Sequence, residues 1–161
     1  MPDTIALLRG VNVGGHRKIA MADLRAIASD CGHRGVQSYI QSGNLVFDRG
    51  QDDLAALARE LEAAIQARAG VSTTVVLRTR RDWEAVALRH PQLGAGAELN
   101  QLHVVFLERA PDPERAASFE GGVFAPDVAT LLDREVYLHT PGGMARTKLT
   151  PPWFERQLGV Q

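Results

Sequence analysis

The chain has 161 residues, of which 45% are hydrophobic and 23% are charged, and this fits one globular domain or two small subdomains. The formal net charge of -1 counts against a general nucleic-acid binder, because such proteins usually have a clear basic excess. No apolar run approaches the roughly 20 residues that a membrane span needs, and the N-terminus lacks the basic and apolar regions of a signal peptide. We therefore expect a cytoplasmic protein without a membrane span.

The first half of the chain predicts six elements in the order strand, helix, strand, strand, helix, strand. An apolar run favours a strand at residues 4–8, and a polar loop follows it to residue 20. Apolar residues at helical spacing then predict one helix that ends at Gly32 and another that begins at Asp52 or Asp53 and ends at Gly70. The remaining strands are expected at 36–40, 45–47 and 73–77. This is the order of a ferredoxin-like βαββαβ unit.

The second half predicts a related series of elements. A helix with a capping-box-like start at 79–82 precedes a loop at 94–101, a strand at 102–107 and a helix that begins at Asp112. Strands at 128–132 and 136–138 form a hairpin, and a last helix covers 152–158. This element order roughly repeats that of the first half if strand 73–77 is shared between the two halves or lies next to the second. We predict an α+β fold with a ferredoxin-like subdomain over 1–79 and a related mixed α/β subdomain over 80–161, packed together as one compact unit.

The loop from Arg9 to Lys18, here called loop 9–18, is the expected working surface. Glycines let backbone N–H groups approach a bound group, and the loop's cations could neutralise phosphate or carboxylate. The loop is not a Walker A motif, because His16 and Arg17 follow its last glycine, and it lacks the dinucleotide-binding spacing. Alternatively, the glycines serve only the crossing from strand to helix and the cations form surface salt bridges. The expected ligand-binding residues of this loop are Arg9, Gly10, Asn12, Gly14, Gly15 and Lys18.

A second cationic segment, residues 146–148, lies near the other end of the chain. Of the 18 basic residues only Lys18 and Lys148 are Lys, and the other 16 are Arg. Lys is a compact point charge and Arg a planar fork, so a site that needs the former would resist a general replacement of Lys by Arg. We therefore expect Arg146, Thr147 and Lys148 to bind the same ligand as loop 9–18. Alternatively, the two lysines remain by chance, and segment 146–148 is only a solvated basic surface.

The expected hairpin turn at residues 41–44 supplies three further polar side chains. We include Gln41, Ser42 and Asn44 among the ligand-binding candidates, although this composition also suits a simple turn. Ser42 is not expected to act as a nucleophile, because no G-x-S-x-G motif surrounds it. No catalytic residue is predicted.

Neither a metal site nor a cofactor is expected. The five histidines lack ligand spacing, and the single cysteine, Cys31, excludes both an internal disulfide and a Cys-based zinc site within one chain. His103 and His139 fall on expected strands and are expected to be packed or hydrogen-bonded.

Several stretches also carry a resemblance to a known family. Residues 5–15 are followed by Lys18 and residues 21–24, then by 39–47, 136–138 and 146–149. In this order they resemble the motifs of a bacterial family known as domain of unknown function 1697. The resemblance implies two α+β subdomains, the first ferredoxin-like, and it implies no chemistry. Members usually continue past the last helix into a segment bearing Thr-Arg-Asn-Trp, whereas this sequence ends at Gln161, either naturally or because a C-terminal piece is absent.

Three functions follow from these features. The first is binding of a small phosphorylated or anionic ligand in a cleft formed by loop 9–18 and segment 146–148. The second is a protein-interaction or regulatory module without catalysis, in which the polar motifs hold the two halves together. Single-stranded nucleic-acid binding ranks below both, because aromatic residues are only 6% of the chain and the first strand has none. The oligomeric state is not predicted.

Overall fold

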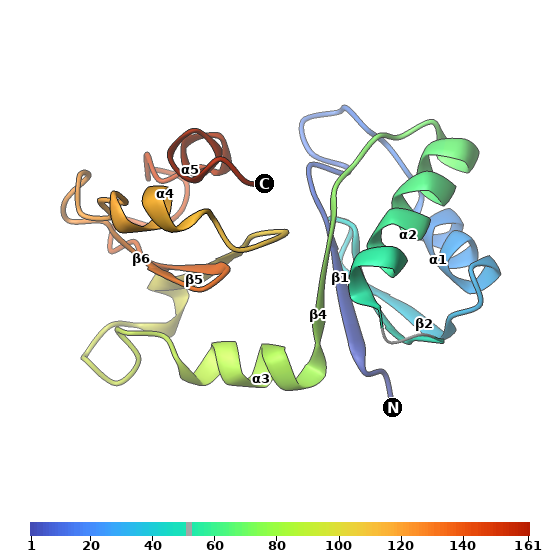
Figure 1. The fold of residues 1–161 in the computed structure, drawn as a ribbon, viewed down its shortest axis with the longest axis horizontal. Coiled ribbons are helices and arrows are strands. Elements are labelled where there is room, and N and C mark those ends of the chain that lie inside the picture. The colour runs from blue at the N-terminus through green and yellow to red at the C-terminus, as the bar shows by residue number, and fades with distance from the viewer. Residues whose placement is uncertain (51–52) are drawn as a thin grey trace. The chain divides into compact units, whose positions relative to one another are not determined.

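The computed structural model describes residues 1–50 and 53–161 as an α+β protein with two antiparallel sheets (Figure 1). The chain divides into two compact units, Met1–Trp83 and Glu84–Gln161, and the division lies inside a helix. No helix among the described residues is long and apolar enough to cross a membrane.

The first unit is a four-stranded sheet with both of its helices on one face (Figure 1). The strands lie in the order β2-β3-β1-β4, and every neighbouring pair is antiparallel. The element order along the chain matches the prediction. The elements are β1 (Thr4–Leu8), α1 (Met21–Asp30), β2 (Arg34–Tyr39), β3 (Asn44–Asp48), α2 (Leu54–Ala69) and β4 (Val75–Thr79).

Helix α2 begins and ends where its local sequence predicts. The Asp53 carboxylate accepts hydrogen bonds from the N–H groups of Ala55 and Ala56, both at 3.0 Å, and so caps the first turn. Gly70 ends the helix in the left-handed region, with φ of 66°. Asp52, the other expected cap, lies outside the described residues. One face of α2 is buried in the first core, together with α1 and the helix-facing side of the sheet.

Two strands of this sheet differ from the prediction by two residues. β2 begins at Arg34 and ends at Tyr39, so Ile40 belongs to the turn, where its φ is 51°. β4 begins at Val75, two residues after the expected start. Thr73 looked like part of the strand because it is β-branched. Its hydroxyl instead donates to the Arg9 carbonyl oxygen at 2.8 Å, which ties the start of loop 9–18 to the connection before β4.

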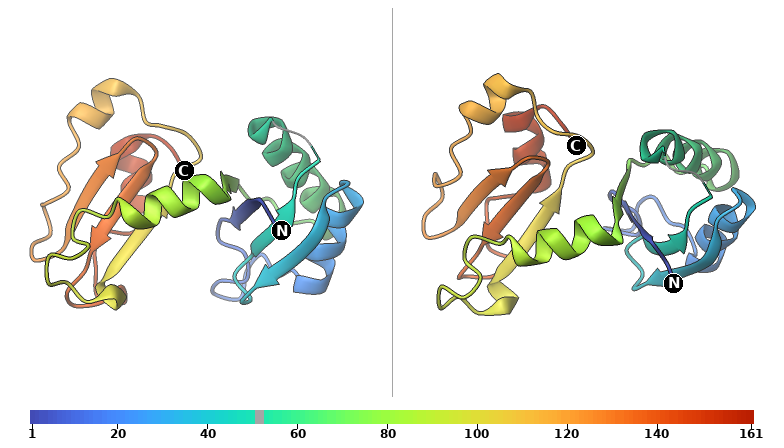
Figure 2. Two further views of the ribbon diagram at one scale, coloured as in Figure 1. Left: turned by 90° about the horizontal axis from the view of Figure 1, so that it is seen from below. Right: turned by 60° about the horizontal axis from the view of Figure 1, so that its bottom comes forward.

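The second unit is built on a three-stranded antiparallel sheet in the order β5-β7-β6 (Figure 2). This order repeats that of β1-β3-β2, whereas β4 pairs with β1 in the first sheet and is not shared. Phe154 and Leu158 of the last helix pack on Val136 and Leu138 of the central strand to form the second core. The elements are α3 (Arg80–Leu88), a short 3-10 turn (Leu99–Gln101), β5 (Leu102–Phe106), α4 (Pro113–Ala117), β6 (Val128–Leu132), β7 (Glu135–His139) and α5 (Pro151–Leu158).

Candidate functional site

Loop 9–18 and the β2–β3 turn meet at one end of the first sheet. Leu8, the last residue of β1, donates its backbone N–H to the Gly43 carbonyl oxygen at 3.1 Å. Gly43 has a φ of 81°, and a Cβ added to it would lie 2.9 Å from Cβ of Leu8 and 3.3 Å from Cβ of Val11. Only glycine therefore fits at this contact. The sequence left open whether the loop and the turn converge, and the structure brings them together.

Asn12 fastens the loop to the turn through its side-chain amide. Its Nδ2 donates to the carbonyl oxygens of Ile19 and Gln41, each at 2.9 Å, and its Oδ1 accepts from the Ile19 N–H at 2.9 Å. Both amide hydrogens are thus used within the protein. The backbone of Asn12 has a φ of 57°, a conformation that Asn tolerates better than most residues. Asn12 therefore shapes the site, and only one lone pair of Oδ1 is left for another partner.

The tip of the loop is a tight, exposed turn. The Asn12 N–H donates to the Arg17 carbonyl oxygen at 3.2 Å, and the Arg17 guanidinium lies over Gly10, 3.2 Å from where a Cβ would be. Gly14 and Gly15 have φ of 63° and 79°, with no atom within 4 Å of an added Cβ. Arg17 also has a positive φ of 49°. A positive φ is unfavourable for Arg, and because such strain often clusters at binding sites, the turn is a candidate binding surface.

Two hollows adjoin this loop, and Lys18 lines both. The first has a volume of about 360 Å³ and is lined by Asn12, Gly15, Lys18, Ile19, Ala20 and Gln41. The second has a volume of about 370 Å³ and is lined by Lys18, Ile19, Ala20, Asp23, Ile27, Arg68 and Ala69. Arg68 is paired with Asp30, whereas no ion pair or hydrogen bond joins the exposed Lys18 side chain to any described residue. Lys18 is therefore available to an anion.

The other expected residues of the first unit have mainly structural contacts. Arg9 is anchored through its backbone, whose N–H donates to the Thr74 carbonyl oxygen at 3.0 Å. Asn44 is the first residue of β3, and its Nδ2 donates to the Ser42 hydroxyl oxygen at 2.9 Å. This bond pairs the two side chains with each other within the turn. The Gln41 side chain is exposed and lines the first hollow.

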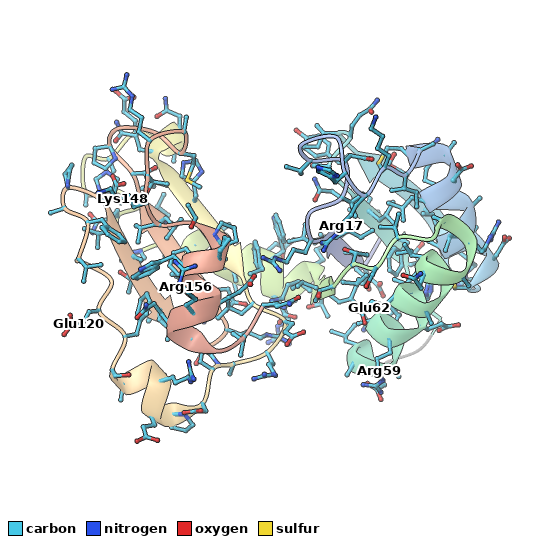
Figure 3. All side chains as sticks on the ribbon, turned by 90° about the horizontal axis from the view of Figure 1, so that it is seen from above. Arg17, Arg59, Glu62, Glu120, Lys148 and Arg156 are labelled. Carbon is cyan, nitrogen blue, oxygen red and sulfur yellow. The ribbon has the colours of Figure 1, made fainter. Side chains whose placement is uncertain are left out.

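Segment 146–148 belongs to the second unit, in the connection between β7 and α5 (Figure 3). Arg146 and Lys148 line a hollow of about 520 Å³ together with residues 123–127, Gly142 and Gly143. The Lys148 Nζ lies 5.8 Å from the centroid of the Phe124 ring, within the range of a cation–π contact. The Thr147 hydroxyl accepts the Leu149 N–H at 3.1 Å and so closes a local turn. The joint cleft with loop 9–18 stays a prediction.

Sequence reasoning missed the wall of this hollow formed by residues 123–127. Nothing in the sequence pairs Phe124, Pro126 or Asp127 with Lys148, because the four are brought together only by the fold of the second unit. The Phe-Ala-Pro run at residues 124–126 was the one signal available in the sequence, and it is a weak one.

Three of the five histidines, His33, His90 and His139, lie in packed or hydrogen-bonded positions, whereas the His16 side chain is exposed and the buried Nε2 of His103 has no hydrogen-bond partner among the described residues. His33 is buried and stacks on Phe47 with ring centroids 4.5 Å apart. His90 Nε2 lies 3.0 Å from the Leu138 carbonyl oxygen, and His139 Nε2 lies 3.4 Å from Gln101 Oε1. Across the described part of the chain, no three His, Cys, Asp or Glu side chains are grouped so as to hold a metal ion.

The comparisons with known proteins identify a family and a fold. The profile described as "Protein of unknown function (DUF1697)" matches residues 1–137. Among solved structures, the conserved bacterial protein SP0830 from Streptococcus pneumoniae is similar, with a TM-score of 0.66 and 22% identity, over 96% of this chain and 81% of that one. At this identity the likeness concerns the fold alone. No curated protein matches the chain.

Proposed function

The chain belongs to the family described as "Protein of unknown function (DUF1697)", and because that description names no reaction we propose a function from the geometry of the site itself. The protein binds a small phosphorylated or anionic ligand, and the first unit holds it at the hollow lined by Lys18, Gly15 and Gln41. The hollow is within the size range of small-molecule sites, roughly 300–1,000 Å³.

The observation that supports this proposal best is the position of Lys18. It lines two adjoining hollows, and although Asp23 lines the second, no described carboxylate forms an ion pair with Lys18. An exposed ammonium gains little from a surface ion pair, so affinity must come from several donors acting together. Gly15 is exposed and its backbone is accessible, and the Gln41 amide can donate as well. Helix α1 begins beside the hollow, and its N-cap residue, Ala20, supplies no side-chain acceptor to the first turn.

The remaining residues of loop 9–18 have supporting roles in this proposal. Asn12 holds the loop against the turn, and Arg9 anchors its start through backbone hydrogen bonds. The description of the first unit as ferredoxin-like is also part of the proposal. It is supported by the element order β1-α1-β2-β3-α2-β4 and the strand order β2-β3-β1-β4.

A thermal-shift titration with inorganic phosphate, pyrophosphate and mononucleotides tests the proposal. We expect at least one of these anions to raise the melting temperature of the wild type, because a ligand that binds only the folded state stabilises it. Lys18→Ala should remove most of that rise. Arg59→Ala is the matched control, because Arg59 is an exposed cation on α2, outside both hollows and away from loop 9–18 (Figure 3). If no anion stabilises the wild type, or if both variants lose the effect equally, the proposal is wrong.

The contribution of segment 146–148 is tested by a double-mutant cycle. If Lys18 and Lys148 bind one ligand molecule, the losses of affinity from Lys18→Ala and Lys148→Ala should be non-additive by about 0.5 kcal/mol or more. Additive losses would mean that the two segments act independently. That result would remove the joint cleft and leave the site of the first unit in place.

One observation favours the second candidate, a protein-interaction module. Three exposed apolar side chains flank the first hollow along the chain, namely Val13, Tyr39 and Ile40, with exposed fractions of 62%, 71% and 60%. Such groups at a loop and a turn are typical of protein contacts. Failure of every anion to stabilise the wild type would favour this alternative.

A further inference from the structure

The hollow of the second unit combines an apolar wall with two cations. Its apolar side is formed by Val123, Phe124 and Pro126, and its cationic side by Arg146 and Lys148. Residues 123–127 lie in the connection before β6, and residues 142–148 lie in the connection after β7. The two connections converge within the second unit, so the site needs no contribution from the first.

The apolar wall is presented to solvent. Val123 is 49% exposed, Pro126 is also exposed, and Phe124 is half-buried. Phe124 is held by an edge-on contact with Trp153, whose ring centroid is 5.4 Å away. The second core therefore fixes the wall in place and leaves part of it uncovered. Apolar surface in this position gains free energy when a ligand covers it.

The charges of the hollow favour an anion. Arg146 and Lys148 are both exposed, and no ion pair joins either side chain to a described residue. Asp127 also lines the hollow, so two cations face one carboxylate. The Lys148 ammonium lies 5.8 Å from the Phe124 ring centroid, which places the charge directly beside the apolar wall.

Together these features select among ligand classes. A bare inorganic anion would use the cations and leave the apolar wall uncovered, whereas a neutral apolar molecule would leave two cations without a partner. A volume of about 520 Å³ is more than an inorganic ion needs and suits a small organic molecule. We propose that this hollow binds an organic phosphate or carboxylate whose anionic group contacts Arg146 and Lys148 and whose apolar group covers Phe124 and Val123. The inference rests on the proposed function, because it assigns the same segment 146–148 to anion binding.

Phenyl phosphate and inorganic phosphate are the two probes that test this inference. We expect the full chain to bind phenyl phosphate about tenfold tighter than inorganic phosphate, as burial of one face of a ring predicts. In a ¹H–¹⁵N correlation spectrum, phenyl phosphate should shift the amides of residues 123–125, 127 and 142–148. Val123→Ser should bring the ratio of the two dissociation constants close to one, and it should fold because Val123 is outside the core. Lys148→Ala should weaken both ligands several-fold.

Arg156→Ala is the control for charge, because Arg156 is an exposed cation of the same unit outside the hollow (Figure 3). It should leave both dissociation constants unchanged. Equal affinity for the two probes, or shifts confined to other residues, would overturn the inference. If inorganic phosphate still binds in a way that depends on Lys18, the proposed function survives that outcome. If neither probe binds, the inference fails, and the titration with pyrophosphate and mononucleotides then decides the proposed function.

Discussion

Replacing Asn12 tests whether one side chain holds loop 9–18 in place. Asn12→Ala removes three hydrogen bonds, two donated to carbonyl oxygens and one accepted from the Ile19 N–H. Each contributes about 1 kcal/mol, and because Asn12 is half-buried we expect a loss of about 2–3 kcal/mol. The left-handed backbone at φ of 57° costs Ala about 1 kcal/mol more than it costs Gly. Asn12→Ala should therefore destabilise the protein by about 3–4 kcal/mol, and Asn12→Gly by about 2–3 kcal/mol.

Urea denaturation at neutral pH measures both losses, as a change in midpoint at constant slope. Gln37→Ala is a suitable control, because Gln37 is exposed on β2 and lies outside the two hollows. A cost below about 1 kcal/mol for Asn12→Ala would refute the reasoning, because three lost bonds cannot be so inexpensive unless water replaces all of them. An equal cost for Ala and Gly would instead show that the left-handed backbone relaxes in the variant.

Three other predictions concern stability. Gly43→Ala should cost about 2–4 kcal/mol in urea denaturation, because the added methyl would lie 2.9 Å from Cβ of Leu8, whereas Gly14→Ala, with nothing near its added methyl, should cost only about 1 kcal/mol. Burial lowers the pKa of His33 below its ordinary 6.5, so the unfolded chain binds more protons there, and stability should fall as the pH drops below about 6.5. His33→Leu should weaken that dependence in denaturation curves recorded between pH 7.5 and 5, and an unchanged dependence would assign it to other groups. Asp53→Ala should cost about 1 kcal/mol through loss of the α2 cap, with Asp53→Asn close to wild type.

Local signals predicted the ends of most elements correctly. Asp53 and Gly70 bound α2 because capping depends on residues within one turn of the helix end. The start of α3 follows the same rule, since the Asp82 carboxylate accepts the Thr79 N–H at 3.2 Å and the Thr79 hydroxyl accepts the Asp82 N–H at 3.1 Å. Such features can be identified from sequence because all the atoms involved lie close together along the chain.

The contacts that could not be predicted from the sequence join residues that lie far apart along the chain. Thr73 has the composition of a strand residue, but its hydroxyl bonds to Arg9, 64 residues away. The amide of Asn12 bonds to the backbone of Gln41, 29 residues away, a contact that the sequence did not indicate. The wall formed by Phe124 could not be associated with Lys148 for the same reason. Sequence patterns indicate which residues are polar or flexible, and the fold decides which of them meet.

The hydrogen bond from the Ile19 N–H to the side chain of Asn12 has a consequence for amide hydrogen exchange. Ile19 lies outside any helix or strand, yet its amide is buried and bonded, so it should exchange slowly. Gly14 and Gly15 lie five and four residues earlier, are exposed, and find no acceptor for their N–H groups among the described residues, so their amides should exchange close to the rate of an unstructured peptide. The amides of Gly14 and Gly15 would then exchange fast, whereas the bonded amides of Arg9 and Ile19 at the two ends of the loop would exchange slowly. The exposed glycines of the turn are therefore open to solvent, while hydrogen bonds hold the backbone on either side of them.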